Sequence, residues 1–291
     1  MALNPRALIK LLRPHQWLKN GFVFVGLLFG HAWGEAATVQ AVLLAALAFC
    51  LVSSAIYVVN DLADREADRL HPHKKHRPLA AGTVSPSHGM VLSAIGAIAG
   101  LALAWSASMQ VLIIVVLYGV LNLLYSWYLK HVVVLDVFVI AAGFMLRILA
   151  GTVGVGIPPS SWLLLTGLMV TLFLGFAKRR AELAVMEHSG APARKVLQNY
   201  SLPMLDVMIG VCATGAVMAY SLYTISDDAI AIHHTTDLIY TVPFVLYGLF
   251  RYLHLSFSSD AGEDPARDLL RDPHLLVTVL GWAVFTFWLL A

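Results

Sequence analysis

The amino-acid sequence predicts an all-α integral membrane protein that crosses the membrane about nine times. Of its 291 residues, 59% are hydrophobic and 12% are charged, whereas soluble domains average about 45–50% apolar and about 25% charged residues. The mean hydropathy is +0.77, and apolar runs long enough for a helix to cross the hydrocarbon layer recur along the chain. This composition excludes a soluble enzyme, a disordered chain and, with a net charge of only +2, a nucleic-acid-binding protein.

Nine apolar segments are candidates for the membrane-spanning helices. The first follows a basic, amphipathic stretch over residues 6–19 without a small-residue cleavage site, so we expect a retained span rather than a cleaved signal peptide. Two connecting loops, 60–87 and 179–203, are longer than a turn between antiparallel helices requires and contain most of the polar residues. The expected spans are residues 20–34, 38–59, 88–106, 109–128, 133–152, 160–178, 204–224, 238–256 and 274–291.

The positive charges predict the orientation of these spans. If the nine segments cross in alternating directions, 18 of the 19 Lys and Arg residues lie on one side, and the remaining one, Arg147, falls within a span. Because basic loops are retained in the cytoplasm, we expect a multi-pass inner-membrane protein whose N-terminus and long loops are cytoplasmic and whose C-terminus is outside. Residues 1–291 then form a single membrane domain, and both long loops, 60–87 and 179–203, lie on its cytoplasmic side.

A cluster of acidic residues marks the cytoplasmic end of the second span, in the segment Asn60-Asp61-x-x-Asp64-x-x-x-Asp68. Helical geometry brings the three aspartates within about 60° of one another. Carboxylates this close repel each other, and a divalent cation relieves that repulsion; few carboxylates with a substrate phosphate and several waters describe a Mg²⁺ site. A solvated helix end paired with neighbouring arginines is the simpler alternative, but acids that continue directly from a membrane span favour function.

Basic residues near the aspartates suit an anionic substrate. Lys74 and Arg77 follow in the same loop, Lys19 enters the first span, and Lys130 and His131 lie at the turn between the fourth and fifth spans. A metal can hold one phosphate while Lys and Arg bind others. The alternative is that these charges only determine the topology.

A second basic motif, Lys178-Arg179-Arg180-x-Glu182, follows the sixth span. Lys178 and Glu182 are four residues apart and therefore face the same side of a helix. A simple intrahelical ion pair would explain them equally well. The motif occupies, in the second half of the chain, the place that the aspartates occupy in the first.

Arg147 is the one Lys or Arg residue that lies within an expected span and away from its cytoplasmic end. It follows Asp136 by 11 residues, or about 16 Å of helix. If the span begins near Asp136, Arg147 is deep in the membrane and should face a polar cavity. If the span begins near Val132, the side chain could instead extend to the outer face. We favour the cavity.

The aspartate motif, followed by Arg77-Pro78-Leu79-x-x-Gly82, resembles the UbiA superfamily of intramembrane prenyltransferases. The resemblance covers nearly the whole chain and implies nine helices around a central cavity beneath a cytosolic cap. Typical aromatic prenyltransferases of this family carry a second aspartate-rich motif where this sequence has Lys178 to Glu182. That departure resembles the branch that uses decaprenyl phosphate and phosphoribose, and three further motifs agree with it: Arg13-Pro-x-Gln16-Trp17-x-Lys19-Asn20, Asp68-Arg69-x-His71-Pro72 and Leu146-Arg147-x-x-Ala150-Gly151.

The resemblance implies transfer of 5-phosphoribose from phosphoribosyl diphosphate (PRPP) to a polyprenyl phosphate, for synthesis of cell-wall arabinan precursors. PRPP carries a diphosphate and a separate 5-phosphate, so it requires Mg²⁺ and additional cations at a distance from the metal. The acceptor lipid phosphate has a second pKa of about 6 and is already anionic near pH 7. No general base is therefore needed, and catalysis consists of metal-assisted departure of diphosphate and positioning of the acceptor.

The expected site residues fall into three groups. Asn60 and Asp64 are the first-choice Mg²⁺ ligands. Asp61, Asp68 and Glu182 are assigned to catalysis in support of the metal site. The group expected to contact PRPP or the lipid phosphate comprises Lys19, Tyr57, Lys74, Arg77, Lys130, His131, Arg147 and Lys178.

Other functions remain open at this stage. An aromatic prenyltransferase would use a prenyl diphosphate, but the second acidic motif is missing. A CDP-alcohol phosphotransferase shares only the spacing from Asp64 to Asp68. A secondary transporter could use Asp136 and Arg147 as a midplane pair, although the polar groups concentrate at one face. The sequence does not determine the length of the lipid chain or whether the protein forms a homo-oligomer.

Overall fold

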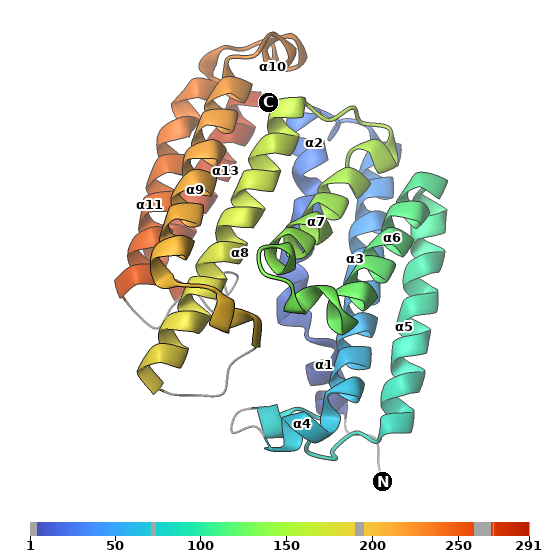
Figure 1. Cartoon of the computed structure of the whole chain (residues 1–291). Coiled ribbons are helices and arrows are strands. Elements are labelled where there is room, and N and C mark those ends of the chain that lie inside the picture. Colours follow the sequence, from blue (N-terminus) through green and yellow to red (C-terminus); the bar gives the residue numbers. More distant parts are fainter. Residues whose placement is uncertain (1–4, 71–73, 190–194, 259–268, 270, 291) are drawn as a thin grey trace. The chain divides into compact units, whose positions relative to one another are not determined.

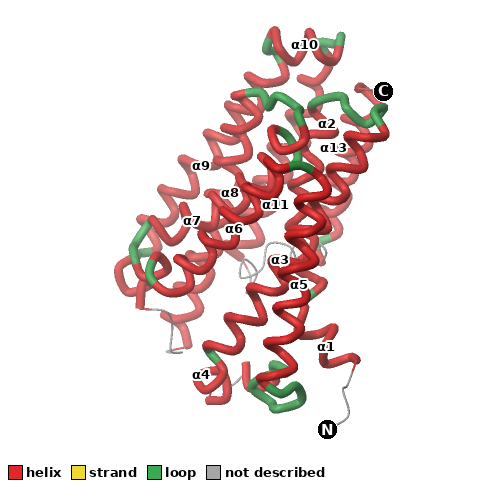
Figure 2. Tube along the Cα trace, turned by 90° about the vertical axis from the view of Figure 1, so that its right-hand side faces the viewer, coloured by secondary structure: helices red, strands yellow, loops and turns green. Residues whose placement is uncertain are grey.

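The computed structural model describes residues 5–70, 74–189, 195–258, 269 and 271–290, and no strand occurs among them (Figures 1 and 2). Eight helices in this part of the chain are long and apolar enough to cross a membrane. They confirm the all-α membrane fold, and the first of the nine expected spans, residues 20–34, is the one that is not among them. The eight spans correspond to the helices α3 (Ala36–Ala63), α5 (Pro86–Ala107), α6 (Met109–Trp127), α7 (Leu135–Ala150), α8 (Ser161–Ser189), α9 (Leu202–Thr224), α11 (Val242–Ser258) and α13 (Pro273–Leu290), and two of the spans reach further, from α7 to Val155 and from Asp237 into α11.

The first expected span, residues 20–34, is not one continuous α-helix. Pro14–Phe24 form a 3₁₀ helix, η1, and only Val25–Phe29 form an α-helix, α2. Glycine weakens an α-helix, and Gly26 lies where two backbones meet. A Cβ atom on Gly26 would lie 1.9 Å from the carbonyl oxygen of Gly151, and one on Gly151 would lie 1.7 Å from that of Val23. The missing side chains allow the first segment to contact the end of α7 directly.

The chain divides into two compact units. Unit 1 comprises Met1–Leu27, Ala32–Ser126 and Leu146–Ile157. Within it, α3 and α5 lie side by side (Figure 2), and a Cβ atom on Gly100 would lie 2.7 Å from a methyl carbon of Val52. Small residues at such positions let membrane helices approach closely. Phe49, Val111 and Val115 fill the core beside this contact.

Unit 2 comprises Leu28–His31, Trp127–Met145 and Pro158–Ala291. Its helices α8 and α9 pack along each other (Figure 1), with Phe173, Phe176 and Leu205 in the core between apolar surfaces. The sixth span was expected to end at residue 178, whereas α8 continues to Ser189. Part of the expected loop 179–203 is therefore helical, because its Ala, Glu, Leu and Met residues are good helix formers.

We predict that Gly151→Ala severely destabilises the protein, because the new Cβ would overlap the backbone of Val23 rather than a side chain that can move. Gly119→Ala in α6 is the matched control, since a Cβ there meets nothing within 4 Å and alanine favours a helix over glycine by about 1 kcal/mol. Thermal unfolding in detergent should show a large fall in Tm for the first variant and none for the second. Equal Tm values for both variants would contradict the backbone contact.

Candidate active site

The aspartate motif does not lie on one continuous helix as expected. The helix α3 ends at Ala63, and Asp64 occupies its C-terminal boundary with φ −89° and ψ 4° before α4 (Arg65–Leu70) begins. The backbone still bonds across the junction, because the Asp68 N–H donates to the Asp64 carbonyl at 2.8 Å. The change of direction separates the three carboxylates into two kinds.

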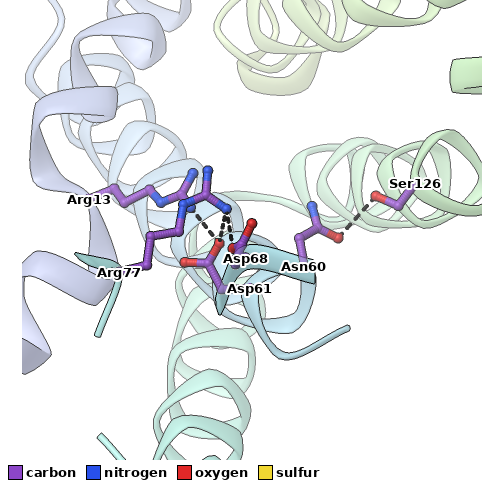
Figure 3. Close-up of polar contacts among 6 residues, drawn as sticks. All are labelled: Arg13, Asn60, Asp61, Asp68, Arg77 and Ser126. Carbon is purple, nitrogen blue, oxygen red and sulfur yellow. Dashed lines mark hydrogen bonds and ion pairs between the residues drawn. The ribbon is translucent and has the colours of Figure 1, made fainter. Parts of the chain in front are cut away.

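Asp61 and Asp68 are buried and bind arginines. Arg77 donates to Asp61 Oδ1 at 3.0 Å and to Asp68 Oδ2 at 2.7 Å, and Arg13 donates to the same Asp61 oxygen at 2.5 Å (Figure 3). The guanidinium of Arg13 lies 5.2 Å from the ring centroid of Tyr57. These ion pairs join the N-terminal segment, the end of α3 and the loop after α4. They also neutralise two of the charges that the sequence suggested would repel.

Asn60 and Asp64 are situated differently. The Asn60 amide points away from the two arginines, and its Oδ1 accepts a hydrogen bond from Ser126 of α6 at 3.0 Å (Figure 3). The Asp64 side chain is exposed, and it has no hydrogen-bond or ion-pair partner within the described part of the chain. A carbonyl oxygen with one further lone pair and an exposed carboxylate are thus available to a ligand.

The donor set fits a metal that is shared with a substrate. No group of three or more His, Cys, Asp or Glu residues in the described ranges is arranged to hold a metal by itself. Mg²⁺ usually takes one or two protein oxygens and completes its octahedron with water and substrate phosphate. The oxygens of Asn60 and Asp64 suit that mode, whereas the carboxylates of Asp61 and Asp68 are already bound by arginines.

Arg147 lies in the interior of unit 1, only 4% exposed. Its Nε donates to Asn20 Oδ1 at 2.7 Å, and its Nη2 donates to Tyr118 Oη at 2.9 Å. The guanidinium also lies 5.3 Å from the ring centroid of Phe49. The side chain is therefore surrounded by aromatic and amide groups, and it does not extend to the surface. Of the other expected contacts in this unit, Lys19 is half-buried and Lys74 is exposed.

Unit 2 contains a buried network that the sequence did not reveal. Arg179 donates through Nε to Asp136 Oδ2 at 2.7 Å and through Nη1 to Glu182, and Asp136 and Arg179 are 0% and 1% exposed. Tyr200 Oη donates to the other Asp136 oxygen at 2.7 Å. Glu182 thus binds Arg179, three residues earlier in the same helix. Within their own units, Asp136 binds Arg179 and Tyr200, and Arg147 binds Asn20 and Tyr118.

The remaining expected residues of unit 2 lie near this network in the sequence. Lys130 and His131 form part of the 3₁₀ turn η3 (Leu129–His131), where Lys130 is half-buried and His131 is exposed. Lys178 is half-buried on α8, beside Arg179. Burial and the neighbouring Asp136 carboxylate raise the pKa of the Tyr200 phenol well above its usual value. The phenol is therefore protonated and can donate a hydrogen bond at neutral pH.

His71 and Pro72, from the motif that includes Asp68, lie outside the described residues.

Comparison with protein families agrees with this arrangement of motifs. The model of the UbiA prenyltransferase family matches residues 21–271. The chain belongs to the UbiA prenyltransferase family. Solved structures with this fold include a UbiA homologue from Archaeoglobus fulgidus bound to GPP and Mg²⁺, with a TM-score of 0.74, 18% identity and coverage of 98% of this chain and 99% of the other. The chain is thus a multi-pass membrane protein of this family.

Curated relatives within the family are more similar in sequence. The decaprenyl-phosphate phosphoribosyltransferase of Mycolicibacterium smegmatis is 35% identical over 94% of this chain and 89% of its own length. The protein of the same name from Corynebacterium glutamicum is 36% identical, covering 94% of this chain and 84% of its own length. That of Mycobacterium tuberculosis is 33% identical over 94% and 91%.

We predict that Asp61→Asn and Asp64→Asn differ in their effect on folding. The first leaves Arg13 and Arg77 facing each other without their shared carboxylate, and it should cost about 1–3 kcal/mol, less than a fully buried pair because both arginines are partly exposed. The second removes an exposed charge without a partner and should be nearly neutral. Thermal unfolding of the purified variants in detergent measures both effects. A Tm for Asp61→Asn equal to that of the wild type would contradict the structural role of these ion pairs.

Proposed function

We propose that this UbiA-family enzyme transfers 5-phosphoribose from PRPP to a polyprenyl phosphate of the decaprenyl class, releasing diphosphate. The observation that carries the proposal is the division of the aspartate motif. Two members bind arginines, and two oxygen donors, on Asn60 and Asp64, are available to a ligand. The 33–36% identity with three enzymes named decaprenyl-phosphate phosphoribosyltransferase supports this choice of substrates.

In this proposal, Asn60 and Asp64 bind Mg²⁺ together with the diphosphate of PRPP. When bound there, the ion neutralises charge that develops on the departing diphosphate. Asp61 and Asp68 act through Arg77, because their carboxylates hold its guanidinium beside the same motif. The Mg²⁺ in the related archaeal structure supports a divalent ion in this family.

The reaction requires one bond to form and one to break. An oxygen of the lipid phosphate attacks C1 of the ribose, and the C1–O bond to diphosphate breaks, with its electron pair leaving on the diphosphate. The attacking phosphate is anionic, so the chain needs to provide no base. Its task is to bind two anions close together and to stabilise the leaving group. Cationic side chains held in fixed positions are effective at this where bulk water is excluded. The positive charge that develops at the ribose resembles that of other glycosyl transfers.

The basic residues of both units remain candidate phosphate contacts in this proposal. In unit 1, Lys19, Lys74, Arg77 and Arg147 are the candidate phosphate contacts, with the Tyr57 ring supporting Arg13. In unit 2, the candidates are Lys130, His131 and Lys178. Arg179, the residue after Lys178, is bound by Glu182 three residues further along the helix. Buried Arg147 supplies positive charge at a fixed position, because Asn20 and Tyr118 orient its planar head.

The location of these residues accords with a cytoplasmic active site in the inner membrane. PRPP is a water-soluble, highly charged donor, and the acceptor is a membrane lipid. A site at the cytoplasmic ends of the spans is accessible to both. The N-terminus and the basic loops would then be inside, as the distribution of Lys and Arg indicates, and the product would supply cell-wall arabinan synthesis.

The substrate assignment predicts that purified protein with Mg²⁺ transfers label from ribose-labelled PRPP into the lipid phase when decaprenyl phosphate is present. No label should enter without the lipid. The competing aromatic prenyltransferase activity is measured in parallel with a prenyl diphosphate and 4-hydroxybenzoate, and it should yield no prenylated aromatic product. Prenylated product in the absence of ribosylated lipid would replace this proposal with its rival.

The metal assignment predicts that Asp64→Asn reduces kcat at least about 100-fold while Tm stays near that of the wild type, because an exposed ligand is lost without an internal contact. Asp228→Asn, which also removes an exposed carboxylate, is the control and should retain full activity. EDTA should abolish wild-type turnover, and excess Mg²⁺ should restore it. Turnover by Asp64→Asn at the wild-type rate would show that the metal lies elsewhere.

A further inference from the structure

The phenol of Tyr200 bridges a backbone turn and a buried carboxylate in unit 2. Its oxygen accepts a hydrogen bond from the Val134 N–H at 2.7 Å and donates one to Asp136 Oδ1 at 2.7 Å. Tyr200 is only 6% exposed, and Asp136 is fully buried. Tyr200 follows the 3₁₀ turn η5 (Lys195–Asn199), 64 residues from Asp136 along the chain. The bridge therefore joins two segments that the sequence alone does not place together.

Val134 adopts a conformation that its residue type disfavours. Its φ is +67°, in the left-handed region where a β-branched side chain is strained. Strain of this kind persists only where surrounding contacts hold the backbone in place. The hydrogen bond to Tyr200 is such a contact, and it acts at the strained residue itself.

The strained residue ends the segment that carries two of the proposed phosphate contacts. Lys130 and His131 lie four and three residues before Val134, respectively, in the turn η3. On the other side of Val134, Asp136 is tied through Arg179 to α8, the helix that carries Lys178. The direction of the chain at Val134 therefore determines where the η3 turn lies relative to α8.

We infer that Tyr200 is a positioning residue, which holds the Val134 turn and thereby places Lys130 and His131 for contact with the phosphates of PRPP. This inference rests on the proposed function, because it concerns the same substrate. Tyr200 itself need not touch substrate. Since its phenol stays protonated at neutral pH, it can both accept from the backbone and donate to Asp136 throughout the working range of the enzyme.

The test is Tyr200→Phe, which keeps the ring and removes both hydrogen bonds. We expect KM for PRPP to rise about tenfold with kcat changed less, because binding groups are displaced while the reacting atoms keep their contacts. Tyr220→Phe is the matched control. It also removes the hydroxyl of a buried tyrosine in unit 2, one that bonds Thr241 at 2.7 Å and Trp282 at 3.0 Å, and it should lower Tm without raising KM.

A rescue variant separates positioning from general stability. Glycine adopts positive φ without strain, so Val134→Gly in the Tyr200→Phe background should keep the turn in place. It should restore KM for PRPP, or folding if Tyr200→Phe alone does not fold. An unchanged KM in Tyr200→Phe, or no recovery with Val134→Gly, would overturn the inference. If wild-type protein transfers no ribosyl label, the proposed function itself fails. That result is distinct from an unchanged KM in Tyr200→Phe and from a lack of recovery with Val134→Gly.

Discussion

The pairing of buried carboxylates with arginines determines which polar groups remain for chemistry. Asp61 forms ion pairs with both Arg13 and Arg77, and Asp136 forms one with Arg179. Each carboxylate is at most 3% exposed, so each would be costly to bury without a partner. Because these acids are satisfied internally, the adjacent oxygens of Asn60 and Asp64 are the ones left to a ligand. The N-terminal segment, the α3–α4 junction and the start of α7 all take their positions from these pairs.

Hydropathy predicted most of the fold because membrane helices obey a simple rule. Every backbone polar group in hydrocarbon must be satisfied within its own segment, so long apolar runs become helices. The same rule does not determine where backbones touch. The first segment is a 3₁₀ helix over Pro14–Phe24, and just after it Gly26 meets the backbone of Gly151, a residue 125 positions away. The extension of α8 to Ser189 was missed for a different reason, since a change from apolar to polar residues ends a membrane span without ending a helix.

The sequence located the acidic motif but not the separate tasks of its members. Spacing placed Asp61, Asp64 and Asp68 on one helical face, because it assumed a helix that continues through Asp64. The backbone turns there instead, and the distinction between buried and exposed acids follows from that turn. The partners were equally beyond local reasoning, since Arg13 and Asp61 are 48 residues apart and Asp136 and Arg179 are 43 apart. Such pairs depend on packing, which spacing does not encode.

Stability alone does not explain an ion pair as deeply buried as Asp136 and Arg179. Removing two charges from water costs about as much as their attraction returns, and apolar replacements are often as stable. The geometry offers a better explanation. A guanidinium has several donors in one plane, so Arg179 can hold Asp136 of α7 and Glu182 of α8 together. A lysine ammonium lacks this planar set of donors, and an apolar pair makes no directional hydrogen bonds. The network thus orients the α8 turn that carries Lys178, which is a task of positioning rather than of stability.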